Sequence, residues 1–561
     1  MHQENEGKLT PWWKESVIYQ IYPRSFQDSN GDGIGDIPGI ISRLDHIHGL
    51  GVDVIWLSPF YPSPNADMGY DIADYKNIHT DYGTMEDFDH LLSEIHSRGM
   101  KLIIDIVLNH TSETHPWFIE SRSSIDNPYR RYYFWKDPAP GGGPPNNWQS
   151  FFGGPAWTFD HSTGQYYLHL FTKEQPDVNW ENEHVRQAYR DILRFWLDKG
   201  VDGFRLDVIP LISKRLDFKD TPYADFQHTI QYVYSNGDRI HEYIKWLHHE
   251  VFSDYPVMTL GEGPGIMPSN VNLYTGNDRS ELNMIYHLDH MFIDFGDGDK
   301  FDHGEWTLEK FMKIFDEWDE ALGDSGWISI SLDNHDFPRM VSRFGNDGEY
   351  WKQSAKLLAT CILTMRGTPG IYQGSEIGMK NVAFQRIEDY RDVETLNFHR
   401  KYLDKGFTTE EFLKRVHRQG RDNARTPVQW SDAPNGGFTT GEPWIGVHPE
   451  YREINAANAL DDPDSIYYYY RDMIALRKQN PVLVTGAYKR LSGMPDNIFA
   501  YSRQLEGEIW LVVLNFYEGT AQIVLPPGVW KSKINNYGPS GELYRGSTQL
   551  EPWQSMVLKK N

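Results

Sequence analysis

The chain has 561 residues, more than one ordinary domain requires, and a formal net charge of −25. So acidic a protein repels phosphate backbones and anionic lipid surfaces, and we therefore expect no nucleic acid and no membrane among its partners. Aromatic residues make up 14% of the chain, with 19 Trp and 33 Tyr. They indicate either a large core or flat surfaces on which neutral rings can stack.

Cysteine usage and hydropathy point to an intracellular location. The single cysteine, Cys361, lies in the apolar segment 357–363, which favours a buried, inert thiol and rules out an intrachain disulfide. No apolar run approaches the roughly 18 residues that span a bilayer, and the polar start MHQENE is not a signal peptide. We expect a cytoplasmic monomer, or a periplasmic or secreted one if the sequence begins at a mature end.

Strand-like apolar runs alternate with amphipathic helical segments such as 85–98 and 184–199. Eight strands separated by helices are typical of an α/β fold, the (β/α)8 TIM barrel, in which each helix returns the chain to the next parallel strand. The eight runs are 17–22, 52–58, 102–109, 201–208, 257–262, 282–288, 328–333 and 370–373.

Two segments depart from this alternation. The segment between the third and fourth strands is rich in Gly, Pro, Asn, Trp and Tyr, and it includes PAPGGGPP at 138–145. After about residue 480, short apolar runs alternate with Gly/Pro turns, which predicts an antiparallel β domain. The expected domains are a barrel (1–110 and 181–480), an inserted subdomain over its mouth (111–180) and a C-terminal β-sandwich (481–561).

Three acids follow buried strand-like runs: Asp207, Glu262 and Asp336. One acid at such a place is usually a helix cap or a surface charge. Parallel barrel strands end at one face, however, so three of them predict carboxylates that converge on one pocket. Glycoside chemistry needs this set: a nucleophile, a proton donor and a stabiliser of positive charge.

The motifs that carry these acids resemble those of the α-amylase superfamily, family thirteen of the glycoside hydrolases. They are DIVLNH at 105–110, GFRLD at 203–207, GE at 261–262 and NHD at 334–336. QPDVN at 175–179 and RDNARTP at 421–427 resemble a narrower group: the oligo-1,6-glucosidases, the sucrose isomerases and the trehalulose or isomaltulose hydrolases. The resemblance covers the whole three-domain layout.

The resemblance implies a role for each acid. Asp207 would attack the anomeric carbon to form a covalent glucosyl-enzyme, and Asp336 would stabilise the oxocarbenium-like state. Glu262 would protonate the leaving oxygen and then deprotonate water, which requires a raised pKa. Arg205, two residues before Asp207 and so on the same face of the strand, would keep that carboxylate ionised and oriented.

The resemblance also implies the residues that hold one glucose ring. Asp67 and Arg421 would close the pocket around the non-reducing end, which gives exo cleavage. His110 and His335 would contact hydroxyls as neutral imidazoles, although a single His at such a position is more often a core residue. The expected substrate-binding set, whose aromatic members would wall the ring, is Asp67, Tyr70, His110, Phe151, Phe171, Gln175, Arg205, His335 and Arg421.

The loop DSNGDGIGD at 28–36 places oxygen ligands at alternate positions, as calcium loops do. It is not an EF-hand, because its twelfth position is Gly39 rather than Glu, and a solvated glycine turn is the alternative. By resemblance the loop would bind a structural Ca²⁺, or Mg²⁺. Its expected ligands are Asp28, Asn30, Asp32, the Ile34 carbonyl and Asp36.

The residues next to the three acids can influence which leaving group the enzyme accepts. Val208 matches the 1,6-specific subgroup, although Val is also simply a good strand residue. Sucrose isomerases carry an arginine-rich loop after the sixth strand, whereas the corresponding stretch here, 287–295, has no arginine. Pro264 stands where those isomerases have Phe, and Gly263 and Phe337 also depart from the subgroup. Without a clamp for fructose, water should capture the glucosyl-enzyme.

The sequence therefore predicts a retaining exo-α-glucosidase that hydrolyses small neutral α-glucosides, preferably 1,6-linked. Isomaltose, isomaltulose, trehalulose and sucrose all stay open as substrates. A sucrose isomerase or a transglucosidase on the same fold is the alternative. A non-catalytic relative, like the heavy chains of amino-acid transporters, is disfavoured because those have lost catalytic acids that this chain keeps.

Overall fold

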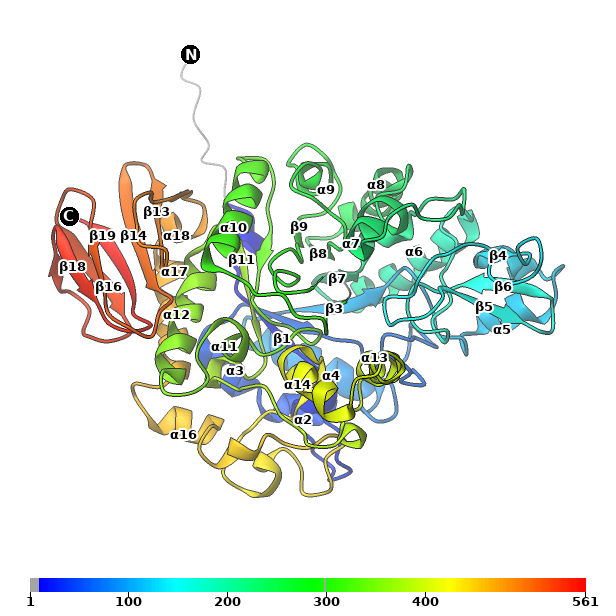
Figure 1. The fold of residues 1–561 in the computed structure, drawn as a ribbon, viewed down its shortest axis with the longest axis horizontal. Coiled ribbons are helices and arrows are strands. Elements are labelled where there is room, and N and C mark those ends of the chain that lie inside the picture. The colour runs from blue at the N-terminus through cyan, green and yellow to red at the C-terminus, as the bar shows by residue number, and fades with distance from the viewer. Residues whose placement is uncertain (1–9, 297–298) are drawn as a thin grey trace, which may run out of the picture.

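The computed structural model describes residues 10–296 and 299–561, and its centre is a parallel eight-stranded barrel (Figure 1). The strand order is β10-β11-β1-β2-β3-β7-β8-β9, and a parallel bridge from Ile285 to Ile328 joins the two ends. Each predicted run overlaps one of these strands, so the predicted (β/α)8 barrel is confirmed. The strands are β1 (Ile18–Ile21), β2 (Val54–Leu57), β3 (Lys101–Val107), β7 (Gly203–Asp207), β8 (Met258–Glu262), β9 (Met284–Tyr286), β10 (Ser329–Ile330) and β11 (Thr368–Tyr372).

Amphipathic helices cover the outside of the barrel. In α6 (Glu183–Asp198) the buried residues include Val185, Tyr189, Ile192 and Trp196, whose spacing of three to four places them on one face. In α4 (Met85–Ser97) a capping box between Thr84 and Asp87 satisfies the first backbone N–H groups. Other covering helices are α2 (Ile37–Ser42), α3 (Leu44–Leu50), α8 (Ile240–Glu250), α10 (Leu308–Leu322), α12 (Trp351–Thr364) and α17 (Ile466–Gln479).

A small antiparallel sheet lies between β3 and β7 in the chain, at the right of Figure 1. Its order is β4-β6-β5, and α5 (Pro116–Ser123) precedes it. Aromatic residues of this segment, among them Trp148 and Phe171, share a hydrophobic cluster with Val208 and Leu211 after β7. The insertion therefore packs directly on the end of the barrel where β7 terminates. Its strands are β4 (Trp135–Lys136), β5 (Trp157–Asp160) and β6 (Gln165–Leu168).

The C-terminal part is antiparallel, as predicted (Figure 1, orange and red). A six-stranded sheet, β12-β13-β14-β19-β16-β17, faces the pair β15-β18. Leu511 and Val513 from the first share a core with Ile523 and Leu550 from the second, which makes the unit a sandwich. The strands are β12 (Ala487–Arg490), β13 (Ile498–Leu505), β14 (Glu508–Asn515), β15 (Ala521–Val524), β16 (Trp530–Asn535), β17 (Leu543–Tyr544), β18 (Ser547–Leu550) and β19 (Ser555–Lys560).

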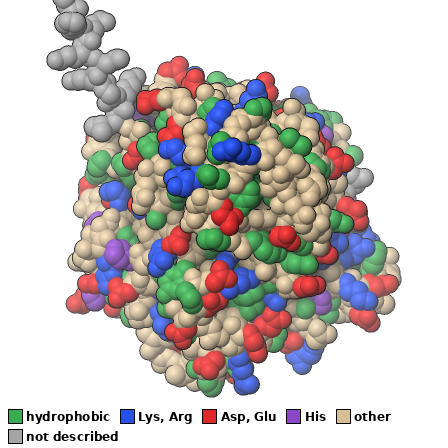
Figure 2. Space-filling model, turned by 90° about the vertical axis from the view of Figure 1, so that its left-hand side faces the viewer, with side chains coloured by type: hydrophobic (Ala, Val, Ile, Leu, Met, Phe, Trp, Pro, Cys, Tyr) green, Lys and Arg blue, Asp and Glu red, His purple; other side chains and the backbone are tan. Residues whose placement is uncertain are grey.

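Surface and core agree with the composition. On the face shown in Figure 2, acidic and basic side chains are interspersed rather than gathered by sign. Cys361 is fully buried in α12, as predicted, and burial raises the pKa of its thiol. Throughout residues 10–296 and 299–561, we find no helix long and apolar enough to cross a membrane.

Candidate active site

One cavity of about 990 Å³ opens at the carboxyl ends of the barrel strands. Asp207 and Glu262 are the last residues of β7 and β8, and Asp336 lies in the loop after β10. Because parallel strands end at the same face, the three acids reach one cavity, as the sequence predicts. The other predicted residues that line it are Asp67, Tyr70, His110, Phe151, Phe171 and Arg421.

Arg205 is the fully buried centre of charge beneath this cavity. Its Nη1 lies 2.6 Å from Asp207 Oδ1, and its Nη2 lies 2.6 Å from Glu262 Oε2. Two carboxylates held by neighbouring nitrogens of one guanidinium must be close to each other. Retaining glycosidases use a close pair of carboxyl groups, about 5 Å apart.

Burial is the largest influence on the pKa of Asp207. It raises the pKa of this carboxyl well above the ordinary Asp value, and the charges of Glu262 and Asp105 add to the rise. Arg205 acts in the opposite direction but does not outweigh burial. The guanidinium of Arg205 faces three carboxylates, and its role in keeping Asp207 ionised for nucleophilic attack stays a prediction.

The pKa of Asp336 is shifted in the opposite direction from that of Asp207. His335 Nε2, Arg421 Nη1 and Arg425 Nη2 each lie 3.1 Å from its carboxylate oxygens. Burial works against ionisation here as well, but these three neighbours hold the pKa of Asp336 well below its usual range. A permanently ionised carboxylate at this place can stabilise a developing positive charge.

Asp67 and Arg421 close one end of the cavity. Arg421 Nη2 lies 3.0 Å from Asp67 Oδ1 and 2.6 Å from Asp392 Oδ1, and all three side chains are nearly fully buried. Gln175 Nε2 donates to Asp67 Oδ2 at 3.2 Å. A pocket blocked by a fixed ion pair accepts only the end of a chain.

The two predicted histidines differ in position. His110 lines the cavity, and burial lowers its pKa to about 4, so its imidazole is neutral at pH 7. His335 lies behind the wall, where its ring stacks on Tyr70 with centroids 5.1 Å apart. Arg205 and Gln175 are likewise buried behind the lining residues. Direct sugar contact by these three residues remains a prediction.

Several residues of the site were not predicted from the sequence. Asp105 accepts hydrogen bonds from Trp56 Nε1 (3.1 Å) and Tyr70 Oη (3.0 Å) and pairs with Arg205 (2.7 Å). A charged residue inside the apolar strand β3 is a signal that could have identified it. Asp392, at the start of α13 (Val393–Asp404), had no such signal. The residues missed are Trp56, Asp105, Tyr286, Asp392 and Arg425.

Val208 is not a strand residue. It follows β7 with φ +36°, in the left-handed region that β-branched residues rarely adopt. Its backbone N–H donates to Glu262 Oε2 at 3.1 Å. The strained backbone at Val208 thus brings its N–H to the carboxylate of Glu262. The preference of Val for strands does not explain this conformation.

The loop at 28–36 is built from successive turns. Asp28 Oδ1 accepts from Asn30 N at 2.9 Å, Asn30 Oδ1 from Asp32 N at 2.9 Å, and Asp32 Oδ1 from Ile34 N at 2.8 Å. Both oxygens of Asp36 accept hydrogen bonds, from Ser29 and from the first turn of α2. Among the residues that the structure describes, no three His, Cys, Asp or Glu side chains gather as metal ligands. A cation would therefore need amide and carbonyl oxygens as well.

The comparisons with known proteins agree with this geometry. Residues 20–486 match the family profile "Alpha amylase, catalytic domain". The chain is 50% identical to the "Oligo-1,6-glucosidase" of Parageobacillus thermoglucosidasius over 98% of this chain and 99% of that one. It is 45% identical to the "Trehalose-6-phosphate hydrolase" of Bacillus subtilis, covering 98% of both.

A solved structure is similar to this chain over its whole length. The isomaltulose synthase PalI from Klebsiella sp. LX3 superposes with a TM-score of 0.96 at 46% identity, over 99% of this chain and all of that one. A parallel barrel with three acids at its mouth is the architecture of a glycosidase. This chain belongs to the alpha-amylase family of glycoside hydrolases.

Proposed function

We propose that the protein is a retaining exo-acting α-glucosidase that hydrolyses short α-glucosides, preferably 1,6-linked. The observation that carries the proposal is the arginine-bridged pair of carboxylates, Asp207 and Glu262, next to a pocket end closed by Asp67 and Arg421. The oligo-1,6-glucosidases that are about 50% identical over the full chain support it.

In this mechanism Asp207 attacks the anomeric carbon of the bound glucose while Glu262 gives its proton to the leaving oxygen. The bond from C1 to the leaving group breaks, and an ester between C1 and Asp207 forms. Water then attacks C1 from the side that the leaving group vacated, and Glu262 takes its proton. The ionised Asp336 stabilises the positive charge that develops in both steps.

Hydrolysis is favoured over isomerisation by the walls of the leaving-group side. Isomerisation needs fructose to stay in place until it attacks C1 again, which requires polar groups that hold its hydroxyls. Pro264, Leu288 and Phe292 line the cavity on the side of Glu262, and none of them offers a side-chain hydrogen bond. The structural similarity to an isomaltulose synthase keeps sucrose isomerisation as the second candidate function.

The test is to incubate the purified protein separately with isomaltose, isomaltulose, trehalulose, maltose and sucrose and to identify the products by chromatography. We expect glucose to be released fastest from the 1,6-linked sugars, without any new disaccharide. Accumulation of isomaltulose or trehalulose from sucrose would establish the isomerase instead.

We also propose that the loop 28–36 binds a structural Ca²⁺ or Mg²⁺. The oxygen-only side chains of Asp28, Asn30 and Asp32 and the nearly buried position of Asp28 support this. Calcium should raise the unfolding temperature of EDTA-treated protein, and the Asp32→Ala variant should not respond. If calcium raises the unfolding temperature of both proteins equally, it binds at another site.

The oligomeric state, location and domain limits remain proposals from the sequence. A monomer is tested by light scattering, and a cytoplasmic location by cell fractionation. The limits of the barrel (1–110 and 181–480), the insertion (111–180) and the C-terminal unit (481–561) are tested by limited proteolysis, which should cut first near these boundaries.

A further inference from the structure

The leaving-group side of the cavity is lined by aromatic rings from two separate loops. Phe292 and Phe295 come from the loop after β9, and Phe337 directly follows the catalytic acid Asp336. The ring centroids of Phe292 and Phe295 are 5.0 Å apart, and that of Phe337 lies 6.0 Å from Phe292. Phe292 and Phe295 line the cavity and are partly exposed, whereas Phe337 is buried behind them.

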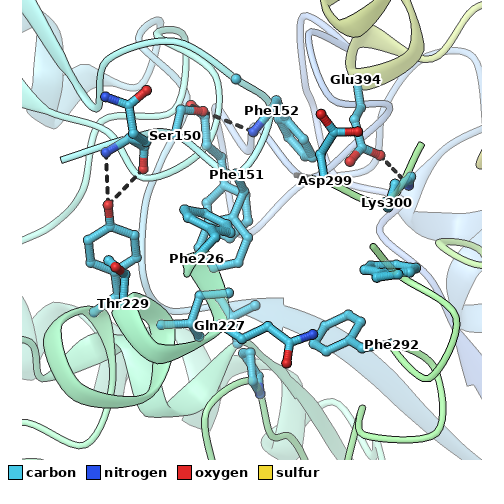
Figure 3. Close-up of a pocket in the computed structure, with 18 of the residues that line it drawn as sticks. Ser150, Phe151, Phe152, Phe226, Gln227, Thr229, Phe292, Asp299, Lys300 and Glu394 are labelled. Atoms are coloured by element: carbon cyan, nitrogen blue, oxygen red, sulfur yellow. Dashed lines mark hydrogen bonds and ion pairs between the residues drawn. The ribbon is translucent and has the colours of Figure 1, made fainter. Parts of the chain in front are cut away.

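A second aromatic wall stands across the cavity. Phe151 stacks on Phe171 with centroids 4.8 Å apart, and Phe226 meets the ring of Phe151 edge-on at 5.2 Å. Figure 3 shows Phe151 and Phe226 on one side and Phe292 on the other, with the side chain of Gln227 reaching between them. The space between the walls is bounded largely by flat apolar surface.

Charged groups that line this cavity are engaged with one another. Lys300 pairs with Glu394, and Lys401 Nζ lies 3.2 Å from Asp299 Oδ2 (Figure 3 shows the first pair). Paired charges offer a sugar hydroxyl little, because binding it would cost part of an existing interaction. Gln227 is an exposed polar residue that lines the cavity.

We propose that this leaving-group site recognises an aromatic alcohol, so that aryl-alkyl α-glucosides are substrates and aromatic alcohols are acceptors of the glucosyl group. This rests on the proposed function, since it concerns the group that Glu262 protonates. A ligand ring would contact the partly exposed Phe292 and Phe295, which Phe337 supports from behind, in offset or edge-on geometry. In the transfer reaction the ester bond between C1 and Asp207 breaks, a bond from C1 to the alcohol oxygen forms, and Glu262 takes the alcohol proton.

Benzyl α-D-glucoside and isomaltose are the substrates for the test. Both release a primary alcohol, so their leaving groups are of similar acidity, and the ratio of their kcat/KM values reports recognition rather than bond reactivity. We expect the wild type to prefer the benzyl glucoside. Phe295→Gln and, independently, Phe292→Gln should each lower the benzyl-to-isomaltose ratio about three- to tenfold, the scale of one aromatic contact.

Tyr517→Ala is the control, because this aromatic residue is exposed in the C-terminal domain, away from the cavity. It should leave the ratio unchanged. If isomaltose is hydrolysed but neither Phe variant changes the ratio, the aromatic site is refuted while the proposed function stands. If no α-glucoside is hydrolysed by the wild type, both fail. A second readout is transfer: benzyl alcohol added to an isomaltose digest should yield benzyl α-glucoside, and less of it in the two variants.

Discussion

Replacement of Arg205 by Met should destabilise the protein in a pH-dependent way. The guanidinium is fully buried and contacts Asp105, Asp207 and Glu262 within 2.7 Å. Breaking a buried ion pair by removing one partner costs about 3–5 kcal/mol, because the remaining charge is left uncompensated. We expect a loss of this size in the free energy of unfolding at pH 7.

The sign of the pH dependence follows from the pKa of Asp207. A carboxyl whose folded-state pKa is raised binds a proton more readily in the folded than in the unfolded protein, so stability falls as pH rises from the unfolded value toward the folded one. Loss of Arg205 raises this pKa further and widens that window. At pH 5 protonation relieves part of the unpaired charge, so the loss should be smaller than at pH 7 by about 1–2 kcal/mol.

Urea denaturation of wild type and variant at pH 5 and pH 7 measures both quantities. Arg477→Met is the matched control, because Arg477 is equally buried but donates to the carbonyl oxygens of Leu363, Leu483 and Gly367 instead of to carboxylates. Its loss should be the same at both pH values. A pH-independent loss for Arg205→Met, or one that is larger at pH 5, would refute the reasoning.

Three further predictions concern single residues. Glu262→Gln should lower kcat on isomaltose by about 10²–10⁴-fold, while a near-normal kcat would assign the proton transfer to another group. His110→Asn should lower kcat/KM without changing the shape of its pH profile between pH 5 and 8, because a pKa of about 4 keeps His110 neutral there; a shifted acid limb would contradict this. Cys361 should not react with a thiol reagent in the native protein, whereas the denatured protein should consume one equivalent of the reagent. Rapid reaction of the native protein would show that α12 opens.

The barrel could be predicted because its strands are short and apolar and are separated by helices of regular period. The acids at the ends of β7 and β8 could be placed together for the same reason, since all parallel strands end at one face. The pairing of Asp67 with Arg421 came from resemblance alone. These residues are separated by most of the chain, and no local pattern connects them.

The features of the site that could not be predicted depend on contacts between residues far apart in the chain. Asp392 and Arg425 surround the ionised Asp336 and Arg421 from a segment that folds back over the barrel mouth. The left-handed backbone at Val208 contradicts the local preference of a β-branched residue, and only the surrounding structure imposes it. The balance between burial and Arg205 at Asp207 likewise requires the three-dimensional arrangement of all the charges.

The anomeric form of the first glucose released from isomaltose tests the central claim most directly. A ¹H NMR time course begun at the moment of enzyme addition separates the α and β anomers before they interconvert. The reducing-end glucose is released as its equilibrium mixture of anomers, so a glucosyl-enzyme on Asp207, opened by water from the vacated side, predicts an initial excess of α-glucose over that mixture. If β-glucose is initially in excess of the equilibrium mixture, no covalent intermediate forms on Asp207 and the retaining mechanism is wrong.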